Sequence, residues 1–510
     1  METKKYYITT PLYYINADPH IGHAYTTLAA DILARHLRAQ GRQVHFLTGT
    51  DEHGANIEKI AREKKVGPQA WADTIAARFA AMWELLDIRY DDFIRTTQPR
   101  HEEAVKLVFE NLLEQGDIYK GSYEGLYCYP CENYWEEKDL KPGNLCPVHG
   151  KPLQSVKEDT YFFRLSKYEN ALLNYFEGHP EFLLPKNRSQ EIINFVKDGL
   201  QDVSVSRSKV AWGIPIRSDP SHTIYVWFEA LLNYATAVGY GERLAHSSED
   251  KAAMRALTGG LDMDRYWPAD YHLMGKEIYR FHAVIWPAML LALGLPLPRR
   301  VFAHGWWTVN GEKMSKSRGN FVDPAGMAAK YGVDALRYFL FREVPFGGDG
   351  DFSVASFRQR YNSDLANDLG NLLNRITNMS VKYLGGTVPE PAQDSAMPAQ
   401  IAETDSAYNA HMQRLEFDMA LNRVWALISG MNRLIDREQP WAKAKTEPEK
   451  LPAIFGDLAA GMLAVSGWLA PFMPGTAEKI RASLRGPDGK IQVCPPLFPR
   501  LADEAAGPAK

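Results

Sequence analysis

The N-terminal part of the chain alternates between the hydrophobic periods of strands and of helices. Short apolar, β-branched runs predict strands, and apolar residues spaced three and four apart predict helices. Such alternation is typical of a parallel sheet with helices on its faces. The predicted elements are strands at 6–10 and 44–49 and helices at 24–39, 70–86 and 102–115.

An insertion interrupts this pattern between about residues 116 and 200, where short aromatic runs, Pro and Gly turns and a cluster of cysteines replace it. The alternation then resumes, with strands predicted at 223–227, 271–274 and 300–304. The sequence therefore predicts an α/β fold in which an insertion splits a Rossmann-type parallel sheet into two halves.

Helical periodicity continues almost throughout the chain beyond about residue 355, with a break at Pro389-Glu390-Pro391 and a polar tail after Pro499. We expect this part to form an all-α helical bundle. The predicted domains are the first half of the sheet at 1–115, the insertion at 116–200, the second half at 201–300, a loop region at 301–354 and the helical bundle at 355–510.

Composition narrows the class of protein without identifying it. Of 510 residues, 45% are hydrophobic and 24% charged, as expected of a soluble globular protein with about three domains. Because the net charge is only −4, any nucleic-acid surface must be a local basic patch. No uncharged apolar run reaches the ~18 residues of a membrane span, and the start has no signal core. We therefore expect a cytoplasmic protein that does not enter membranes.

Two distant segments are suited to holding nucleotide phosphates. In the first, Asp18 can cap and Pro19 can open the following helix. His20 and His23 then lie at the positive end of the helix dipole, where Gly22 leaves room for an approaching ring.

The second segment, residues 313–317 with the sequence Lys-Met-Ser-Lys-Ser, lies between Gly311 and Gly319. The ammonium groups of Lys313 and Lys316 can close over a polyphosphate and stabilise charge that moves onto pyrophosphate. Either segment alone is weak evidence, since histidines at a helix start often only cap it and a Lys/Ser loop is often only solvated. Together, and in this order, they predict an ATP-using ligase.

Three cysteines and a histidine in the insertion have the spacing of a zinc knuckle. Cys128 and Cys131 form one pair, and Cys146 and His149 follow as a second pair after fourteen residues. Three thiolates and one imidazole can complete a tetrahedron around zinc, and a site filled entirely by protein would be structural. The alternative is three buried cysteines and a surface histidine.

Further motifs make the chain resemble one family over essentially its whole length. They are Thr9-Thr10-Pro11-Leu12-Tyr13-Tyr14-Ile15-Asn16, Gly49-Thr50-Asp51-Glu52-His53-Gly54, Tyr225-Val226-Trp227-Phe228-Glu229-Ala230 and His272-Leu273-Met274-Gly275-Lys276-Glu277. With the two phosphate segments, they make the chain similar to the methionyl-tRNA synthetases, class I enzymes, of the bacterial type with a single zinc knuckle. Phe228-Glu229 and Leu231-Leu232-Asn233 depart from the Leu-Asp and Pro-Ile-Gly of some members.

The resemblance implies a site for methionine. Asp51 should hold the ammonium group as a charge-assisted pair, at the edge where an α/β sheet binds its ligands. An apolar and aromatic pocket should take the thioether, with a weak hydrogen bond to sulfur from Tyr14 or His282. The side-chain pocket that the resemblance assigns consists of Leu12, Tyr14, Trp227, Ala230, Leu231, Tyr234, Phe281 and His282.

The resemblance also implies an ATP site, with Mg²⁺ bound to ATP. Its members are His20 and His23 at the α-phosphate, Gly22 at adenine, Glu277 at the ribose, and the phosphate cations Arg207, Lys276, Lys313 and Lys316. The implied reaction forms methionyl adenylate and pyrophosphate. A second step would pass methionine to the terminal adenosine of initiator and elongator methionine tRNAs.

The helical part would read the anticodon of the tRNA. Asn371 and Arg375 lie four residues apart on one face of a predicted helix, and the family reads base edges at these positions. Trp441 follows Gln439-Pro440, a helix start, where an exposed indole can stack on an unpaired base. From the residues alone, an ordinary bundle with Trp441 in its core remains the alternative.

The activity implied by the resemblance is that of a methionine–tRNA ligase, expected as a monomer because no added C-terminal barrel is visible. Two other classes stay open: a small-molecule nucleotidylyltransferase with the same phosphate site, and an inactive RNA-binding paralogue. The helical third argues against the first, and the intact loop at 313–317 argues against the second.

Overall fold

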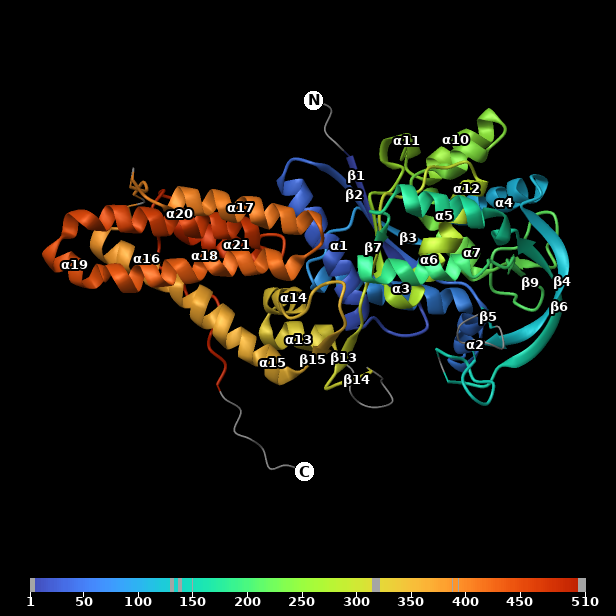
Figure 1. Cartoon of the computed structure of the whole chain (residues 1–510), viewed down its shortest axis with the longest axis horizontal. Helices are drawn as coiled ribbons and strands as arrows, with labels where there is room; N and C mark the ends of the chain where they lie inside the picture. The colour runs from blue at the N-terminus through green and yellow to red at the C-terminus, as the bar shows by residue number, and fades with distance from the viewer. Residues whose placement is uncertain are drawn as a thin grey trace. The chain divides into compact units, whose positions relative to one another are not determined.

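The chain forms two compact units. Unit 1 consists of Met1–Pro19, Gly41–Glu84 and Ile88–His304, and unit 2 of His20–Gln40, Leu85–Asp87 and Gly305–Lys510. The computed structural model in Figure 1 describes residues 5–128, 133–135, 140–148, 150–313, 322–387, 389–392 and 394–502. The five predicted domain boundaries stay a prediction.

Unit 1 is built on a six-stranded parallel sheet, so the α/β prediction is confirmed. The strand order is β3 (Asp92–Arg95), β2 (Gln43–Asp51), β1 (Lys5–Tyr14), β11 (Tyr271–Gly275), β12 (Val301–His304) and β7 (Leu183–Leu184). The strand order reverses at β1, which lies between β2 and β11. Ligands of open α/β sheets bind at the carboxyl ends of the strands beside such a reversal.

Helices of the same unit surround these strands (Figure 1). They are α2 (Ala55–Glu63), α3 (Pro68–Leu85), α4 (Pro99–Glu114), α5 (Glu169–Gly178), α6 (Lys186–Lys197), α7 (Val226–Leu231), α8 (Asn233–Thr236), α9 (Tyr240–Leu244), α10 (Ser248–Leu257), α11 (Met263–Tyr266) and α12 (Trp286–Ala292). Three short turns join them: the 3₁₀ helices η2 (Leu165–Tyr168) and η3 (Lys276–Ile278), and the π-helix η4 (Phe281–Ile285).

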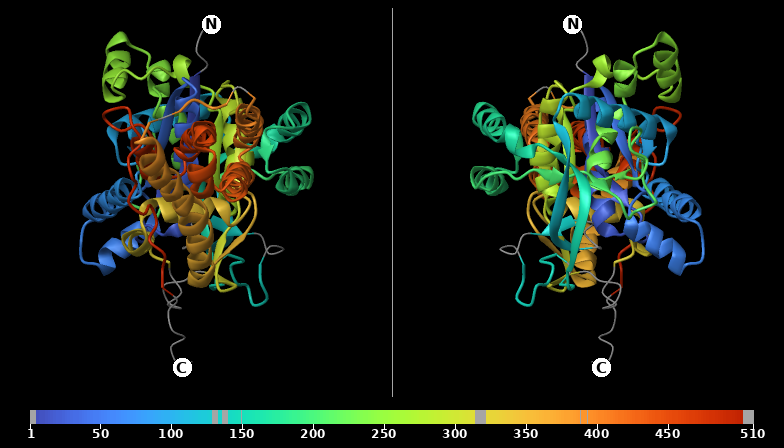
Figure 2. Two further views of the ribbon diagram at one scale, coloured as in Figure 1. Left: turned by 90° about the vertical axis from the view of Figure 1, so that its left-hand side faces the viewer. Right: turned by 90° about the vertical axis from the view of Figure 1, so that its right-hand side faces the viewer.

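A second, antiparallel sheet lies mainly in the predicted insertion, with its last strand just beyond it. Its order is β5 (Asn133–Trp135), β4 (Ile118–Cys128), β6 (Gln154–Phe163) and β8 (Val203–Ser204). The two long strands β4 and β6 pair over ten residues each and form the extended ribbon visible in Figure 2. Cys128 is the last residue of β4.

One predicted strand is wrong. Only Thr223–Ile224 of the run at 223–227 is extended, as β10, and it pairs with β9 (Ser206–Arg207) outside the six-stranded sheet. From Val226 the chain is helical, as α7. Aromatic and β-branched residues favour strands in isolation, but such propensities yield to tertiary contacts.

Unit 2 is mostly helical, as predicted for the C-terminal part. Its helices are α1 (Ile21–Ala39), α13 (Pro324–Tyr331), α14 (Val333–Arg342), α15 (Val354–Arg360), the π-helix η6 (Tyr361–Gly370), α16 (Asn371–Leu384), α17 (Met397–Gln413), α18 (Phe417–Glu438), α19 (Pro440–Thr446), the 3₁₀ helix η7 (Pro448–Lys450), α20 (Leu451–Leu469) and α21 (Pro474–Leu484). A small sheet of β14 (Glu312–Lys313), β13 (Trp307–Val309) and β15 (Gly350–Phe352) completes it.

The apolar helix α20 lies in this bundle. Among the residues that the structure describes, one helical stretch, Pro448–Leu469, is long and apolar enough to cross a membrane by length and composition. Its most apolar window is 61% buried within the protein. Such burial is what a core helix of a bundle requires.

A buried arginine connects helix α1 to the rest of unit 2. Arg337 on α14 is 0% exposed, and its guanidinium donates to the carboxylate of Asp31 on α1 at 2.6 Å. The same guanidinium donates to four main-chain carbonyls, those of Leu86, Asp87, Pro471 and Phe472. Asp31 also accepts from Arg35 at 2.8 Å. Because a buried ion is stable only when its hydrogen-bonding positions are filled, this cluster fixes α1 against α14 and the end of α20.

Candidate active site

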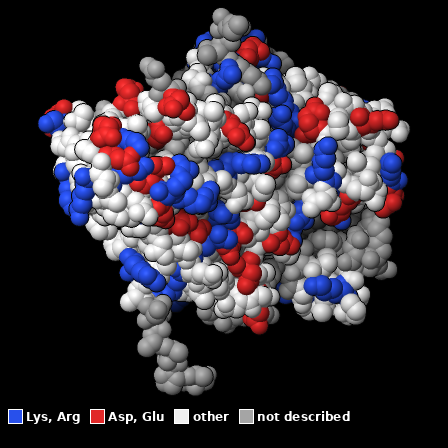
Figure 3. Space-filling view, turned by 60° about the vertical axis from the view of Figure 1, so that its left-hand side comes forward, with Lys and Arg blue, Asp and Glu red and all other residues white. Residues whose placement is uncertain are grey.

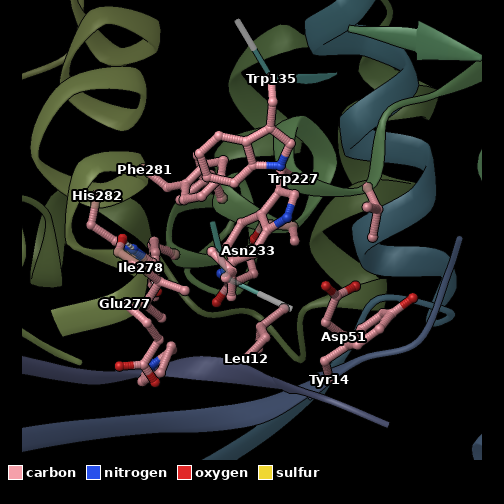
Figure 4. Close-up of a pocket in the computed structure, with 16 residues that line it drawn as sticks. Leu12, Tyr14, Asp51, Trp135, Trp227, Asn233, Glu277, Ile278, Phe281 and His282 are labelled. Carbon is pink, nitrogen blue, oxygen red and sulfur yellow. Dashed lines mark hydrogen bonds between the residues drawn. The ribbon is translucent and has the colours of Figure 1, made fainter. Parts of the chain in front are cut away.

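Unit 1 contains a cavity of about 290 Å³ at the carboxyl ends of β1 and β2 (Figure 4). All nine residues that the resemblance assigned to methionine line it: Leu12, Tyr14, Asp51, Trp227, Ala230, Leu231, Tyr234, Phe281 and His282. They come from β1, β2, the short helices α7 and α8, and η4. The fold therefore gathers into one cavity residues that are far apart in the sequence.

The acidic end of the cavity is formed by two neighbouring strands. Tyr14 and Asp51 are register partners at the ends of β1 and β2, and Figure 4 shows them beside each other. Asp51 is only 6% exposed. A carboxylate with so little water around it interacts strongly with a cation, such as the ammonium group of an amino acid.

The other end of the cavity is aromatic. The ring of Trp227 stacks on that of Phe281, with centroids 4.0 Å apart and planes 11° from parallel. Phe281 and His282 belong to the π-helix η4, and single π-turns inside helices are frequent at functional sites. A slot of this kind suits a flexible and polarizable apolar chain.

His282 and Tyr234 are bonded to each other in the cavity wall. The Nδ1 of His282 lies 3.0 Å from the carbonyl of Ile278 and therefore donates to it. Its Nε2 is then the acceptor for the Tyr234 hydroxyl at 2.7 Å. Burial lowers the pKa of His282 to about 4, so the ring is neutral. The expected hydrogen bond from His282 to sulfur is thus not available in this arrangement, because its one N–H is already used.

At the start of helix α1, two histidines each accept a main-chain hydrogen bond through Nδ1. The helix is capped by His20, whose Nδ1 accepts from the Gly22 N–H at 3.1 Å, while the His20 N–H donates to Nδ1 of His23 at 3.3 Å. The prediction that Asp18 caps this helix is wrong; Asp18 instead accepts from Arg78 at 2.5 Å. Because Nδ1 is the acceptor in both rings, the proton of each neutral ring is on Nε2, a donor suited to phosphate oxygens.

Gly22 is required by this cap. A Cβ at this position would lie 2.9 Å from Cε1 of His20, closer than carbon atoms normally approach. The rings of His20 and His23 also stack, with centroids 3.7 Å apart. The absence of a side chain at Gly22 thus has a structural cause in addition to the predicted contact with adenine.

The predicted phosphate and ribose residues of unit 1 line a larger second cavity of about 1460 Å³. Arg207, Lys276 and Glu277 all lie along it, and Glu277 also lines the smaller cavity. The Arg207 guanidinium is held at 2.8 Å from the hydroxyl of Ser204 and 4.1 Å from the ring centre of Tyr225. These contacts fix the orientation of the guanidinium group.

The second phosphate segment lies largely outside the described residues. The backbone of Lys313 forms the end of β14, paired with Thr308. Lys316 and the neighbouring residues 314–321 lie outside the part of the chain that the structure describes.

Two of the four predicted zinc ligands can be placed. Cys128 ends β4 and Cys146 follows a tight turn, and both are buried. The turn after Cys146 is closed by a hydrogen bond from the Gly150 N–H to the Cys146 carbonyl at 2.8 Å, with Gly150 at φ +63°. Cys131 and His149 lie outside the described residues. Two buried thiols and a tight turn after one of them are features of a zinc knuckle.

Two of the three predicted anticodon residues, Arg375 and Trp441, lie close together in unit 2. Arg375 on α16 extends to within 5.9 Å of the Trp441 ring centre on α19, and it also pairs with Asp436 at 2.7 Å. Asn371 begins α16 and is exposed. Trp441 is 43% exposed, so the alternative that places it in the core is wrong. An exposed indole beside an arginine is suited to stacking on a base.

Sequence reasoning missed part of the lining of the smaller cavity. The additional residues are Pro11, Trp135, Val148, Val226, Asn233 and Ile278. Most of them adjoin motifs that were recognised, so their neighbours in the sequence could have indicated them. Trp135 and Val148 come from the insertion, and only the long-range fold brings them to the cavity.

Comparisons with known proteins agree with this geometry. A sequence profile described as tRNA synthetases class I (M) matches residues 6–155 and 139–377, and one described as the anticodon binding domain of methionyl tRNA ligase matches residues 385–493. The chain is 49% identical over 483 residues to the methionine–tRNA ligase of Caldanaerobacter subterraneus subsp. tengcongensis, covering 94% of this chain and 73% of that protein. Identity to the methionine–tRNA ligase of Thermotoga maritima is 44% over 484 residues, covering 93% and 74%.

A solved structure is also similar over nearly the full length. It is the Mycobacterium tuberculosis methionyl-tRNA synthetase in complex with methionyl-adenylate, with a TM-score of 0.89 and 39% identity. The match covers 97% of this chain and 99% of that chain.

Proposed function

Because the chain belongs to the class I methionyl-tRNA synthetases, we propose that the two cavities described in unit 1 bind methionine and ATP, and that His20 and His23 donate to the phosphates. The protein is a methionine–tRNA ligase: it joins methionine to the AMP moiety of ATP with release of pyrophosphate, and then transfers methionine to the 3'-terminal adenosine of its tRNA. The observation that carries the assignment of the methionine site is the single cavity in unit 1 that all nine assigned residues line.

In this proposal Asp51 binds the ammonium group and the stacked rings of Trp227 and Phe281 enclose the thioether. Glu277 lines both cavities, so a ribose bound there lies next to the amino acid. The reaction needs no protein nucleophile, since the methionine carboxylate itself attacks the α-phosphate. Catalysis would come from positioning and from donors aimed at the phosphates.

The cations proposed for phosphate are Arg207, Lys276, Lys313 and Lys316, with His20 and His23 donating through Nε2. Mg²⁺ would enter bound to ATP and neutralise part of the triphosphate charge. We further propose that the enzyme is a cytoplasmic monomer that does not associate with membranes.

The proposed tRNA-reading surface is small and combines an exposed indole with polar side chains. It consists of Asn371, Arg375 and Trp441 on α16 and α19. Figure 3 shows Lys and Arg interspersed with Asp and Glu on one face of the molecule, without a broad area of one sign. With a net charge of −4, specificity must come from local contacts such as base stacking, not from a general attraction of phosphate.

A comparison of the two half-reactions tests this function. The parent enzyme should exchange pyrophosphate into ATP with methionine and with none of the other nineteen standard amino acids at a comparable rate. Trp441→Ala should leave this exchange nearly unchanged. It should lower kcat/KM for methionine tRNA by about ten- to a hundredfold, because a lost base stack costs about 1–3 kcal/mol. Arg375→Ala should show a loss of similar size.

The matched control is Trp306→Ala, which removes a similarly exposed indole, 41% against 43%, that lies on neither α16 nor α19. For this variant, the ratio of kcat/KM for tRNA with the CAU anticodon to kcat/KM for tRNA with an altered anticodon should equal that of the parent. If Trp441→Ala and Arg375→Ala charge this tRNA as well as the parent, the surface is not the anticodon reader.

We propose that one structural zinc is bound per chain by Cys128, Cys131, Cys146 and His149. Zinc there would supply folding energy to the end of the β4–β6 ribbon and take no part in the reaction. The burial of Cys128 and Cys146 and the closed turn after Cys146 support this assignment.

Elemental analysis of the purified enzyme should find about one zinc per chain. Cys146→Ala should release the metal and increase proteolytic cleavage of the insertion, since binding energy at such a site is also folding energy. Cys494→Ala, which removes another buried cysteine, should keep the full zinc content. An active parent enzyme without zinc would contradict the assignment.

A further inference from the structure

Helix α7 contains a fully buried acid that has no part in the reaction. Glu229 is 0% exposed and follows Trp227 by two residues. Trp227, Ala230 and Leu231 of the same six-residue helix all line the methionine cavity, whereas Glu229 does not. Its side chain therefore leaves α7 on the side away from the cavity.

The carboxylate of Glu229 lies between two histidines from other parts of unit 1. Its Oε1 is 2.9 Å from Nδ1 of His53, and its Oε2 is 2.8 Å from Nε2 of His101. The second nitrogen of His101 is 2.9 Å from the hydroxyl of Thr236 on α8. One acid thus connects the segment after β2, helix α4, helix α7 and helix α8.

Three of these connected segments carry a methionine contact close by in the sequence. His53 follows Asp51 by two residues, and Thr236 follows Tyr234 by two residues. Asp51, the aromatic wall that includes Trp227, and Tyr234 are therefore fixed to one another through Glu229. A shift of about 1 Å in any of them would spoil the fit of a bound amino acid.

The charges in the cluster are consistent with a static role. Burial raises the pKa of Glu229 and lowers that of His53 to about 4, so His53 is neutral at physiological pH. His53 then donates its Nδ1–H to Glu229, and its ring also lies 5.4 Å from that of Trp212. The hydrogen bonds hold the acid, and removing it would leave two imidazole N–H groups buried without acceptors.

We propose that Glu229 is a positioning residue for methionine: it holds Asp51, the aromatic wall of α7 and Tyr234 in register by bonding His53 and His101 at once. This inference rests on the proposed function of the cavity. It concerns geometry, and Glu229 itself touches no substrate.

The test compares Glu229→Ala with Glu229→Gln in methionine-dependent pyrophosphate exchange. Alanine removes both acceptors and should raise KM for methionine about tenfold or more, with KM for ATP nearly unchanged. Glutamine keeps the shape and can accept from one ring and donate to the other. His101 can take the opposite tautomer, because the Thr236 hydroxyl can accept its proton while donating to the Asn233 carbonyl at 3.3 Å. The glutamine variant should therefore stay within about threefold of the parent KM.

A control separates positioning from simple loss of folded protein. Asp117→Asn removes another buried carboxylate of unit 1, bonded to Lys167 and Tyr168, that lines neither cavity. It should lower stability without changing KM for methionine. Circular dichroism and burst titration of adenylate give the folded and active fraction of each variant. A lower rate that is caused only by less folded protein can then be distinguished from a change in KM.

Thr236→Val provides a milder change if Glu229→Ala does not fold. It should raise KM for methionine severalfold, because His101 loses its second partner. A parental KM in folded Glu229→Ala, or in Thr236→Val when the first does not fold, overturns the proposal. So does a glutamine variant as impaired as the alanine variant. A parent enzyme that fails to exchange pyrophosphate with methionine would instead overturn the function of the cavity.

Discussion

Replacing His20 by alanine is expected to lower kcat for methionyl adenylate formation by about 10²–10³-fold. The Nδ1 of His20 accepts from the Gly22 N–H, which places the proton of the neutral ring on Nε2 at the start of α1. Such a donor acts on charge that develops in the transition state, and removing one typically costs this much in kcat. Pyrophosphate exchange at saturating methionine and ATP measures the effect.

The variant has a second consequence that must be separated from the first. His20 is also the N-cap of α1, and loss of a cap costs about 1 kcal/mol of stability. His20→Asn keeps a good capping group but has no imidazole, so it should recover the thermal midpoint and not the rate. Equal rates in the asparagine variant and the parent would show that His20 acts only as a cap.

Replacing Arg337 by alanine should destabilise unit 2 by about 3–5 kcal/mol, because it leaves the buried carboxylate of Asp31 without its principal partner. Four main-chain carbonyls lose their donor at the same time. Urea unfolding followed by helical circular dichroism should show an early transition that the parent lacks.

Arg437→Ala is the matched control, since Arg437 is 72% exposed and forms a surface pair with Glu438. Exposed pairs contribute about 0–1 kcal/mol, so its unfolding curve should overlie that of the parent. An Arg337→Ala curve that also overlies it would mean that Asp31 finds other partners, such as Arg35 alone.

The parallel sheet and the helical bundle could be predicted from the sequence because their patterns are local. Strands β1, β2, β11 and β12 are short runs rich in aromatic, aliphatic and β-branched residues, and the bundle helices repeat apolar residues every three or four positions. The strand β7 has only two residues, Leu183–Leu184, and no pattern that short distinguishes a strand from a loop. Its place at the edge of the sheet comes from tertiary contacts alone.

The errors arose where tertiary contacts outweigh local preference. The strand predicted at 223–227 gives way to helix α7 from Val226, and Glu229 of this helix bonds two histidines that are distant in the sequence. Asp18 is a better intrinsic cap than His20, but the ring of His20 already lies over the Gly22 N–H. Neither His53 nor His101 is near α7 in the sequence.

The candidate site was predictable as a set of residues and not as an arrangement. The family resemblance indicated each of the nine cavity residues, but not that the one N–H of His282 is used by the Ile278 carbonyl. Hydrogen-bond partners of this kind come from main-chain groups, which carry no sequence signal.

The attachment of helix α1 to the rest of unit 2 through Arg337 delays the completion of this enzyme during its synthesis. Asp31 and Arg337 are separated by 306 positions. At the usual ~5–20 residues per second, a ribosome takes about 15–60 s to make the stretch between them. Throughout that interval the helix that carries His20 lacks the guanidinium that holds it. A nascent chain that stops before Arg337 therefore contains every residue of the methionine cavity, but it lacks the side chain that holds helix α1 in place. We expect activation of methionine to begin only after the C-terminal half has been made.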